Sequence, residues 1–206
     1  MTIETWLGFV AASAVLLVIP GPTILLVVSY ALGRGWKVAA PVATGVALGD
    51  LTAMTLSMLG VGALLAGSAA LFTAVKWIGA GYLVFLGIKL WRAGAAFEAE
   101  ARTEAAAPGR MLAHAWLVTT LNPKSIVFFV AFLPQFLDPA RPFWPQMAVF
   151  EATFVTLAFA NAFGYALLAA RARRLAESPR AIRLFNRAGG TALIAAGAAA
   201  VTVRAA

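Results

Sequence analysis

Residues 5–33 read TWLGFVAASAVLLVIPGPTILLVVSYALG, a run without a single charged residue. A membrane-crossing helix needs about 20 predominantly apolar residues, so this run is long enough to span a bilayer. Pro20-Gly21-Pro22 interrupts it, because two prolines remove two helical donors and Gly21 permits unusual backbone dihedrals. We therefore predict a spanning helix that is broken at mid-depth; the alternative is a plain structural kink.

A second apolar run repeats this pattern. Residues 115–137 read AWLVTTLNPKSIVFFVAFLPQFL, and Asn122-Pro123-Lys124 interrupts them with both a proline and a lysine. A broken helix frees backbone N–H and C=O groups, which transporters use to bind substrates near the bilayer midplane. A helix that only anchors a protein has no need of such a break. The two breaks are therefore the best candidates for a functional site.

The composition places the chain among integral membrane proteins. Of its 206 residues 62% are hydrophobic and 12% are charged, whereas a soluble domain is roughly half apolar and a quarter charged. The chain has no cysteine and one histidine, which excludes disulfides and thiolate metal sites, so we expect neither a metal nor a cofactor. The net charge of +8 resides in membrane loops, where insertion explains it, so nucleic acid is not an expected partner.

The hydropathy pattern predicts an all-α integral membrane fold with six transmembrane helices in a single polytopic domain, residues 1–206. A turn is expected near Gly67-Ser68, and four prolines mark the loop before the fifth span: Pro134, Pro139, Pro142 and Pro145. The longest polar segment, 93–110, is the expected mid-chain loop. The predicted spans are 5–33, 39–64, 71–90, 111–132, 143–170 and 188–203.

The basic residues predict the orientation of these spans. With six spans, twelve lysines and arginines fall in the first, third and fifth loops, and three fall on the opposite side. Cytoplasmic loops are enriched in basic residues, so both termini are expected outside the cytoplasm and the 93–110 loop inside it. The twelve are Arg34, Lys37, Lys89, Arg92, Arg102, Arg110, Arg171, Arg173, Arg174, Arg180, Arg183 and Arg187, and the three are Lys76, Arg141 and Arg204.

The spans also suggest two inverted three-helix repeats, residues 1–92 and 111–206. Each half opens with a broken helix, and its second helix carries one acid, Asp50 or Glu151. The acid follows its proline by 30 residues in the first half and by 28 in the second. Inverted-repeat transporters place their site at the interface of such repeats. Chance similarity between Pro-rich membrane helices is the alternative.

Asp50 and Lys124 are charges at mid-depth, where an ionised side chain costs on the order of 3 kcal/mol. Asp50 must therefore face the protein interior, where it would bind a cation or an amino group, or carry a proton. Lys124 would attract a substrate carboxylate, or pair with Asp50 or Glu151. A purely structural lysine–acid pair between two helices is the alternative for both residues.

Four further positions have more than one possible role. The Asn122 amide can bond backbone groups freed by Pro123, and Thr23 can supply a hydroxyl to a ligand or to its own helix. Glu151 is a candidate for lining an outer vestibule or for coupling, with an interfacial position equally open. Asn161 is as well suited to bond a neighbouring helix as to touch a substrate.

Gly45 and Gly49, four residues apart, form a small-xxx-small face. We expect these glycines to let another helix approach closely. They would also let Asp50 approach a broken helix.

Together these motifs resemble the LysE/RhtB superfamily of bacterial amino-acid exporters. The resemblance runs from about Trp6 to Phe136, beyond which only the hydrophobic pattern and the acid of the fifth span agree. It is carried by Pro20-Gly21-Pro22, Gly45-x-x-x-Gly49-Asp50, Lys76-x-x-Gly79-Ala80-x-Tyr82-Leu83-x-x-Leu86-Gly87, Asn122-Pro123-Lys124 and Pro134-Gln135-Phe136.

The resemblance implies an exporter of amino acids or close derivatives in the bacterial inner membrane, driven by the proton gradient. It places function on the residues already selected: Pro20, Gly21, Pro22, Asp50, Asn122, Pro123 and Lys124. The substrate's carboxylate is expected on freed backbone donors and Lys124, with its amino group facing Asp50.

Two other classes of function compete with transport. An intramembrane enzyme is disfavoured, because one histidine, no cysteine and two separated acids offer no nucleophile–base pair. A non-transporting membrane scaffold or accessory subunit is the main alternative. The expected partners are an amino-acid substrate, protons and the lipid bilayer, and homo-oligomerisation is left open.

Overall fold

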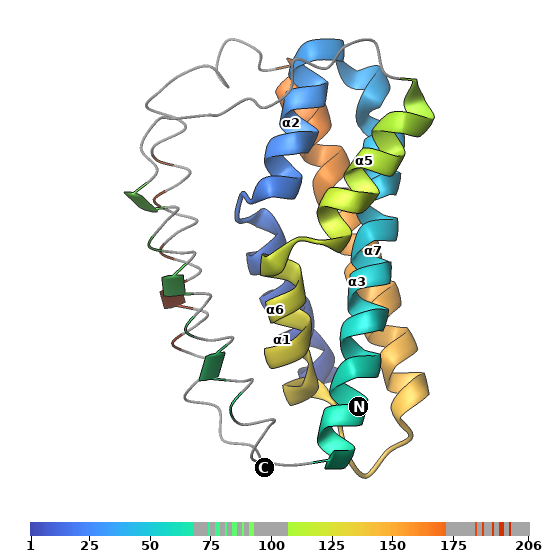
Figure 1. The fold of residues 1–206 in the computed structure, drawn as a ribbon, viewed down its shortest axis with the longest axis vertical. Coiled ribbons are helices and arrows are strands. Elements are labelled where there is room, and N and C mark those ends of the chain that lie inside the picture. Colours follow the sequence, from blue (N-terminus) through green and yellow to red (C-terminus); the bar gives the residue numbers. More distant parts are fainter. Residues whose placement is uncertain are drawn as a thin grey trace.

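The computed structural model describes residues 1–67 (backbone only from 61) and 107–171, together with scattered helical positions between 74 and 92 and between 184 and 198. Within the two continuous ranges, the chain forms helices joined by short turns (Figure 1). In chain order they are α1 (Ile3–Val18), α2 (Pro22–Arg34), the 3₁₀ helix η1 (Trp36–Val38), α3 (Ala39–Gly67), α5 (Pro108–Thr120), α6 (Pro123–Ala131), the 3₁₀ helix η2 (Leu133–Phe136) and α7 (Phe143–Arg171).

The described helices cover four of the six predicted spans: 5–33, 39–64, 111–132 and 143–170. The stretch Trp36–Gly60 and helix α7 are each long and apolar enough to cross a membrane. Two more candidates are bent pairs: α1 and α2 meet at 55°, and α5 meets the segment Pro123–Phe136 at 47°. Both bends occur at the predicted breaks, which confirms the broken helices. The described residues thus supply two to four candidate spans.

Three expectations fall almost wholly outside the described residues: the spans 71–90 and 188–203 and most of the loop 93–110. The count of six spans and the inverted repeat therefore stay predictions. Helix α5 begins at Pro108, three residues before the predicted start of the fourth span. Proline suits the first helical turn, where its missing N–H is not needed.

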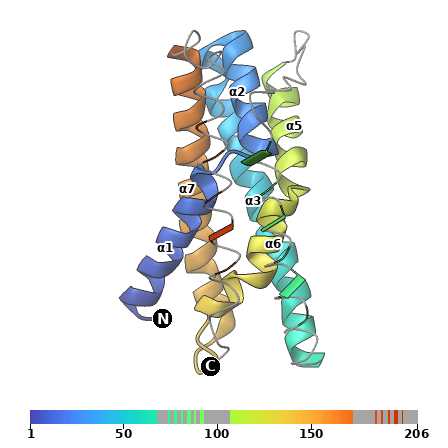
Figure 2. The same cartoon turned by 90° about the vertical axis from the view of Figure 1, so that its left-hand side faces the viewer.

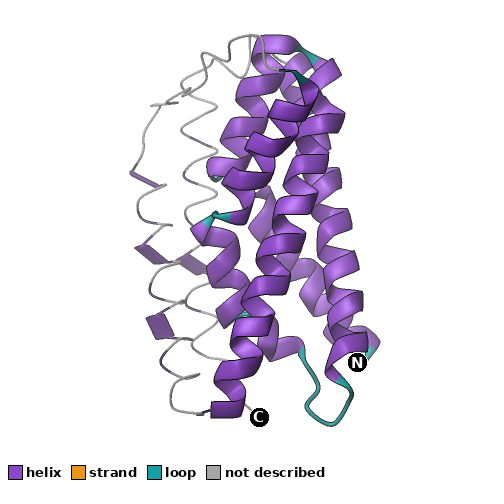
Figure 3. Cartoon of the chain, turned by 45° about the vertical axis from the view of Figure 1, so that its right-hand side comes forward, coloured by secondary structure: helices purple, strands orange, loops and turns teal. Residues whose placement is uncertain are grey.

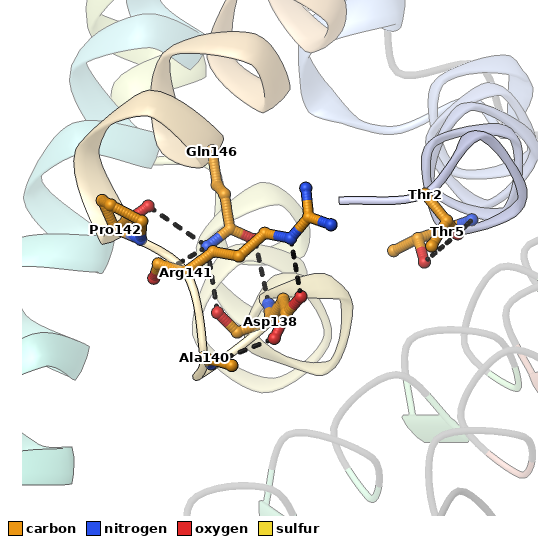
Figure 4. A network of polar contacts seen from close by, with 7 residues as sticks. All are labelled: Thr2, Thr5, Asp138, Ala140, Arg141, Pro142 and Gln146. Atoms are coloured by element: carbon orange, nitrogen blue, oxygen red, sulfur yellow. Dashed lines mark hydrogen bonds and ion pairs between the residues drawn. The ribbon is translucent and has the colours of Figure 1, made fainter.

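The loop before α7 is shorter than its prolines suggested. Pro134 lies inside η2 and Pro145 in the first turn of α7, so these two do not belong to the loop. Gln146 holds the remaining turn together: its Oε1 accepts from Asp138 N at 2.9 Å, and its Nε2 donates to three carbonyls, of which Asp138 O lies at 3.0 Å (Figure 4). The Arg141 guanidinium closes the turn on the Asp138 carboxylate at 3.1 Å. This loop projects from one end of the bundle (Figure 3).

The opposite end of the bundle carries the basic residues of α2, η1, α5 and α7. There α2 ends, α5 begins and α7 ends (Figures 1 and 2). We call it the basic end, defined by Arg34, Lys37, Arg110 and Arg171.

Within the two continuous ranges, the buried apolar residues form two clusters of different composition. The phenylalanine cluster joins α1, the second half of α3, α6 and the first half of α7, and its buried aromatic rings are Phe9, Phe128, Phe129, Phe150 and Phe154. The alanine cluster lies toward the basic end and joins α2, the first half of α3, α5 and the second half of α7. Its buried alanines are Ala31, Ala39, Ala43, Ala115, Ala162, Ala166 and Ala169. Aromatic rings fill wide gaps, whereas alanines let the helices approach closely.

The Gly45–Gly49 face packs against α5, as predicted. A Cβ at Gly45 would lie 2.3 Å from Leu112 O, and one at Gly49 would lie 2.6 Å from Thr119 Cβ. Neither position has room for a side chain, so the two backbones are in close contact. This contact brings Asp50, the next residue of α3, beside the second broken helix.

Candidate functional site

In the described part of the chain eight polar or charged side chains are buried: six on α2, α3, α5 and α6 near the two breaks, Ser13 in α1 and Gln146 at the start of α7. We call the six near the breaks the polar layer. The polar layer consists of Thr23, Asp50, Thr119, Asn122, Lys124 and Ser125, all at most 7% exposed. Sequence reasoning selected Thr23, Asp50, Asn122 and Lys124, and the structure brings these four together.

The two breaks contact each other through Thr23. Its Oγ1 accepts a hydrogen bond from Asn122 Nδ2 at 3.0 Å and another from Thr119 Oγ1 at 3.3 Å. Thr23 belongs to the first turn of α2, whereas Thr119 and Asn122 flank the break between α5 and α6. The two interruptions, about 100 residues apart in sequence, therefore form one structure.

Asn122 also caps its own helix. Its Oδ1 accepts from Lys124 N at 3.1 Å, which satisfies a donor at the start of α6. This confirms the expectation that the amide bonds backbone groups next to Pro123. The second break is thus closed largely by neighbouring residues, with Asn122 N donating to Thr119 O at 3.0 Å.

The first break is closed by side chains from distant helices. Lys124 Nζ donates to Leu16 O at 3.0 Å and to Ile19 O at 2.7 Å. From α7, Asn161 Nδ2 donates to Leu17 O at 3.0 Å and Tyr165 OH donates to Val18 O at 2.8 Å. Ile19 N donates to Val15 O, so every carbonyl from residue 15 to residue 19 accepts a hydrogen bond. The last carbonyls of a helix have no partner within it, so these donors satisfy the end of α1.

Lys124 therefore caps α1 in this structure. The side chain is 7% exposed, and its Cε and Nζ each lie 3.5 Å from the position that a Cβ on Gly21 would take. The C-terminal end of a helix carries negative partial charge, so an ammonium group is favoured there. Of the three partners considered from sequence, none was a backbone carbonyl, because the fold alone brings α6 to the end of α1.

Gly21 does not adopt the unusual backbone dihedrals that a glycine at this position suggested. Its backbone is extended, with φ −137° and ψ −172°, a conformation open to other residues. What matters is the missing side chain, since the Lys124 ammonium lies against it. Among the described glycines the positive φ belongs to Gly35, which ends α2.

Asp50 is 2% exposed, and its Oδ1 has no hydrogen-bond partner. The carboxyl group interacts with the Ser125 hydroxyl and, electrostatically, with the Lys124 ammonium. Within the described ranges the close ion pair is Arg141–Asp138, so Asp50 and Lys124 do not form one. A buried carboxylate oxygen without a partner is costly, so Asp50 is a candidate for binding a ligand or a proton.

The ends of the first break present opposite partial charges. No side chain caps the N-terminus of α2, where Thr23 and Ile24 are buried. The first N–H groups of a helix lack partners within it and favour an anion.

The three prolines of the breaks differ in position. Pro20 is buried within the first break, whereas Pro22 and Pro123 are exposed at the first positions of α2 and α6, where they start helices.

Glu151 lies apart from the polar layer. It is half-buried on α7 beside Phe150 of the phenylalanine cluster, and Thr55 Oγ1 donates a hydrogen bond to its Oε1. Thr55 follows Asp50 by five residues, about 7.5 Å along α3. The two acids thus lie at different depths. In the described part of the chain, no three acidic or histidine side chains gather where a metal could bind.

Sequence reasoning missed part of this site. The sequence pattern does not single out Thr119, Ser125 or Tyr165, and it leaves two roles open for Asn161. One signal was available: Asn161 and Tyr165 are four residues apart, so they share a face of α7. Their target, the carbonyl end of α1, follows from the tertiary packing alone.

Membrane-length helices, two of them bent around a buried polar layer, define a polytopic membrane protein. Residues 14–203 match the family model described as LysE type translocator. The chain belongs to this family, which makes it a membrane transporter and not an enzyme.

Several relatives resemble the chain over about two thirds of its length or more. An uncharacterized membrane protein of Vibrio cholerae is 37% identical over the whole of both chains. A homoserine/homoserine lactone efflux protein of Salmonella typhi is 32% identical over 99% of both. A leucine efflux protein of Salmonella choleraesuis is 38% identical over 66% of this chain and 65% of its own length. No solved structure matches.

Proposed function

We propose that this protein exports an amino acid, or a close derivative, from the cytoplasm across the bacterial inner membrane in exchange for protons. The observation that carries the proposal is the polar layer, which places Asp50 and Lys124 where two broken helices meet between apolar clusters. Relatives named for the efflux of homoserine and of leucine support the substrate class. The basic end faces the cytoplasm in this proposal, following the distribution of lysine and arginine.

Each group of the site has a part in this function. The substrate's carboxylate docks at the N-terminus of α2, where backbone N–H groups of the first turn are available. Asp50 carries the coupling proton, because its Oδ1 has no other partner. The phenylalanine cluster closes the site from the outer side, and the alanine cluster closes it from the cytoplasmic side. Transport then requires each cluster to open in turn.

The deciding experiment is efflux from proteoliposomes loaded with labelled amino acids, with and without an imposed proton gradient. The wild-type protein should export at least one amino acid faster when the gradient is present. Asp50→Asn should abolish this export while the protein still inserts and unfolds cooperatively. Asp138→Asn, in the loop before α7, is the matched control and should export at the wild-type rate.

Two results would decide against the proposal. Export by Asp50→Asn at the wild-type rate would remove the coupling role from this residue. The scaffold alternative is favoured if the wild-type protein exports none of the labelled amino acids and cells carrying substitutions at Asp50 and Lys124 still make the folded protein and behave as the wild type. Glu151→Gln tests the second coupling candidate. This variant should retain gradient-driven export if Asp50 alone carries the proton.

A further inference from the structure

The carbonyl end of α1 has the chemistry of an ammonium-binding site. Leu16 O and Ile19 O lie 3.0 and 2.7 Å from Lys124 Nζ, in a buried position that also has the negative end of a 16-residue helix behind it. The bound group is a primary ammonium, the same group that a free amino acid carries at its α-carbon. Here it is attached to the protein through a flexible four-carbon chain.

Asp50 offers the Lys124 ammonium a second position. The two groups interact electrostatically without forming a close ion pair, and Asp50 Oδ1 has no hydrogen-bond partner. The other charged group near this part of α3 is Glu151, which is already bonded by Thr55. Pairing with Lys124 would satisfy the buried oxygen of Asp50. It would also leave the carbonyls of Leu16 and Ile19 available to another donor.

We infer that the carbonyls of Leu16 and Ile19 form the subsite for the substrate's ammonium group, and that Lys124 is its tethered competitor, which moves to Asp50 when substrate enters. The inference rests on the proposed function and changes one expectation from sequence: the substrate's amino group meets backbone carbonyls, and Lys124 meets Asp50. The two ends of the broken span then bind the two charges of one zwitterion, with the carboxylate at the N-terminus of α2.

This arrangement makes the substrate and the proton exclude each other. A proton on Asp50 removes the charge that attracts Lys124, so the ammonium returns to the α1 carbonyls and expels the substrate. Loss of that proton draws Lys124 away and opens the subsite. A single lysine moving between two positions would thus suffice for exchange.

The first test asks whether the α1 carbonyls bind an untethered ammonium group. Lys124→Ala removes the side chain beyond Cβ, and n-propylammonium supplies the removed atoms. At ten times its dissociation constant it should raise the melting temperature of purified Lys124→Ala by about 3 °C. Competition by Lys124 should limit the rise for the wild type to about 1 °C. Lys37→Ala, a control at an exposed lysine, should behave as the wild type. If the variant is recovered only with propylammonium present, that recovery is the same rescue. Absence of both effects overturns the subsite.

The second test asks whether the substrate uses the same carbonyls. The amino acid that the wild type exports in proteoliposomes should displace radiolabelled propylammonium from Lys124→Ala. Its amino alcohol, which lacks the carboxylate, should displace it too, whereas the corresponding acid without an amino group should not. Propylammonium that stays bound under saturating amino acid and amino alcohol overturns the inference.

A third measurement uses a variant that does not leave the space of the lysine side chain empty. Lys124→Met keeps most of the side-chain volume but removes the competing ammonium. The amino alcohol should bind this variant about tenfold more tightly than the wild type, as expected if Lys124 occupies the carbonyls nine-tenths of the time. Equal or weaker binding would contradict competition. Export by the wild type tests the proposed function separately: a wild type that exports amino acids but shows no competition refutes this inference alone.

Discussion

The two broken helices are closed in different ways. The break between α5 and α6 is held by its own residues, chiefly by the Asn122 side chain and by the bond from Asn122 N to Thr119 O. The break between α1 and α2 depends on side chains of α6 and α7, which are more than 100 residues away in sequence. A locally capped break is rigid in itself, whereas a break capped from other helices changes when those helices move.

This difference assigns different parts to the two breaks. The second break positions Lys124 and Asn122 at fixed points of α6, and the first supplies the carbonyls and N–H groups that a ligand can take over. Substitutions at the first break should therefore affect both stability and transport. Substitutions that remove only the local cap of the second break should affect mainly stability.

The largest effect is expected from Lys124→Met. It leaves Leu16 O and Ile19 O without their donor and removes the only positive charge of the polar layer. Each unsatisfied buried carbonyl costs about 1–3 kcal/mol, so the free energy of unfolding should fall by about 3 kcal/mol. Denaturant unfolding in detergent micelles measures it, and gradient-driven export should be lost. A loss of stability below that of Asn122→Ala would contradict the comparison.

The next largest effect should come from Asn161→Leu combined with Tyr165→Phe. This pair removes the donors to Leu17 O and Val18 O while keeping the apolar bulk of both side chains. We expect a loss of about 2 kcal/mol in the free energy of unfolding. Thr156→Val, elsewhere on α7, is a matched control, because the Thr156 hydroxyl bonds only its own helix at Ala152 O. Equal effects of the pair and the control would show that α7 does not support the first break.

The sequence predicted the second break better than the first, because the second is capped by its own residues and the first by distant helices. Asn122 before Pro123 is a recognisable local cap, and the structure confirms it. Asp50 could be placed in the interior because an ionised acid is too costly in lipid, and the Gly45–Gly49 face indicated the close helix that it approaches. The partners of Lys124, Asn161 and Tyr165 could not be predicted, because they are backbone carbonyls that carry no signal in their residue types.

A smaller effect is expected at the second break itself. Asn122→Ala removes both the cap on Lys124 N and the bond to Thr23, which should cost about 1–2 kcal/mol. Asn122→Asp keeps the capping oxygen but loses the donor to Thr23, so it separates the two contributions. If the aspartate variant is as stable as the wild type, the bond between the two breaks contributes little. Thermal unfolding of both variants decides this point.

The smallest effect on stability, and the most selective one, should come from Gly21→Ala. The backbone of Gly21 is extended and an added Cβ would lie 3.5 Å from Lys124 Cε and Nζ, an ordinary van der Waals distance. The free energy of unfolding should therefore change by less than about 1 kcal/mol. The methyl group would nevertheless stand beside the moving ammonium, between the ends of the two half-helices. We expect export to slow several-fold while the melting temperature stays within a few degrees of the wild type. Export at the wild-type rate would mean that Lys124 does not pass Gly21 during the cycle, and that the first break acts as a fixed scaffold like the second.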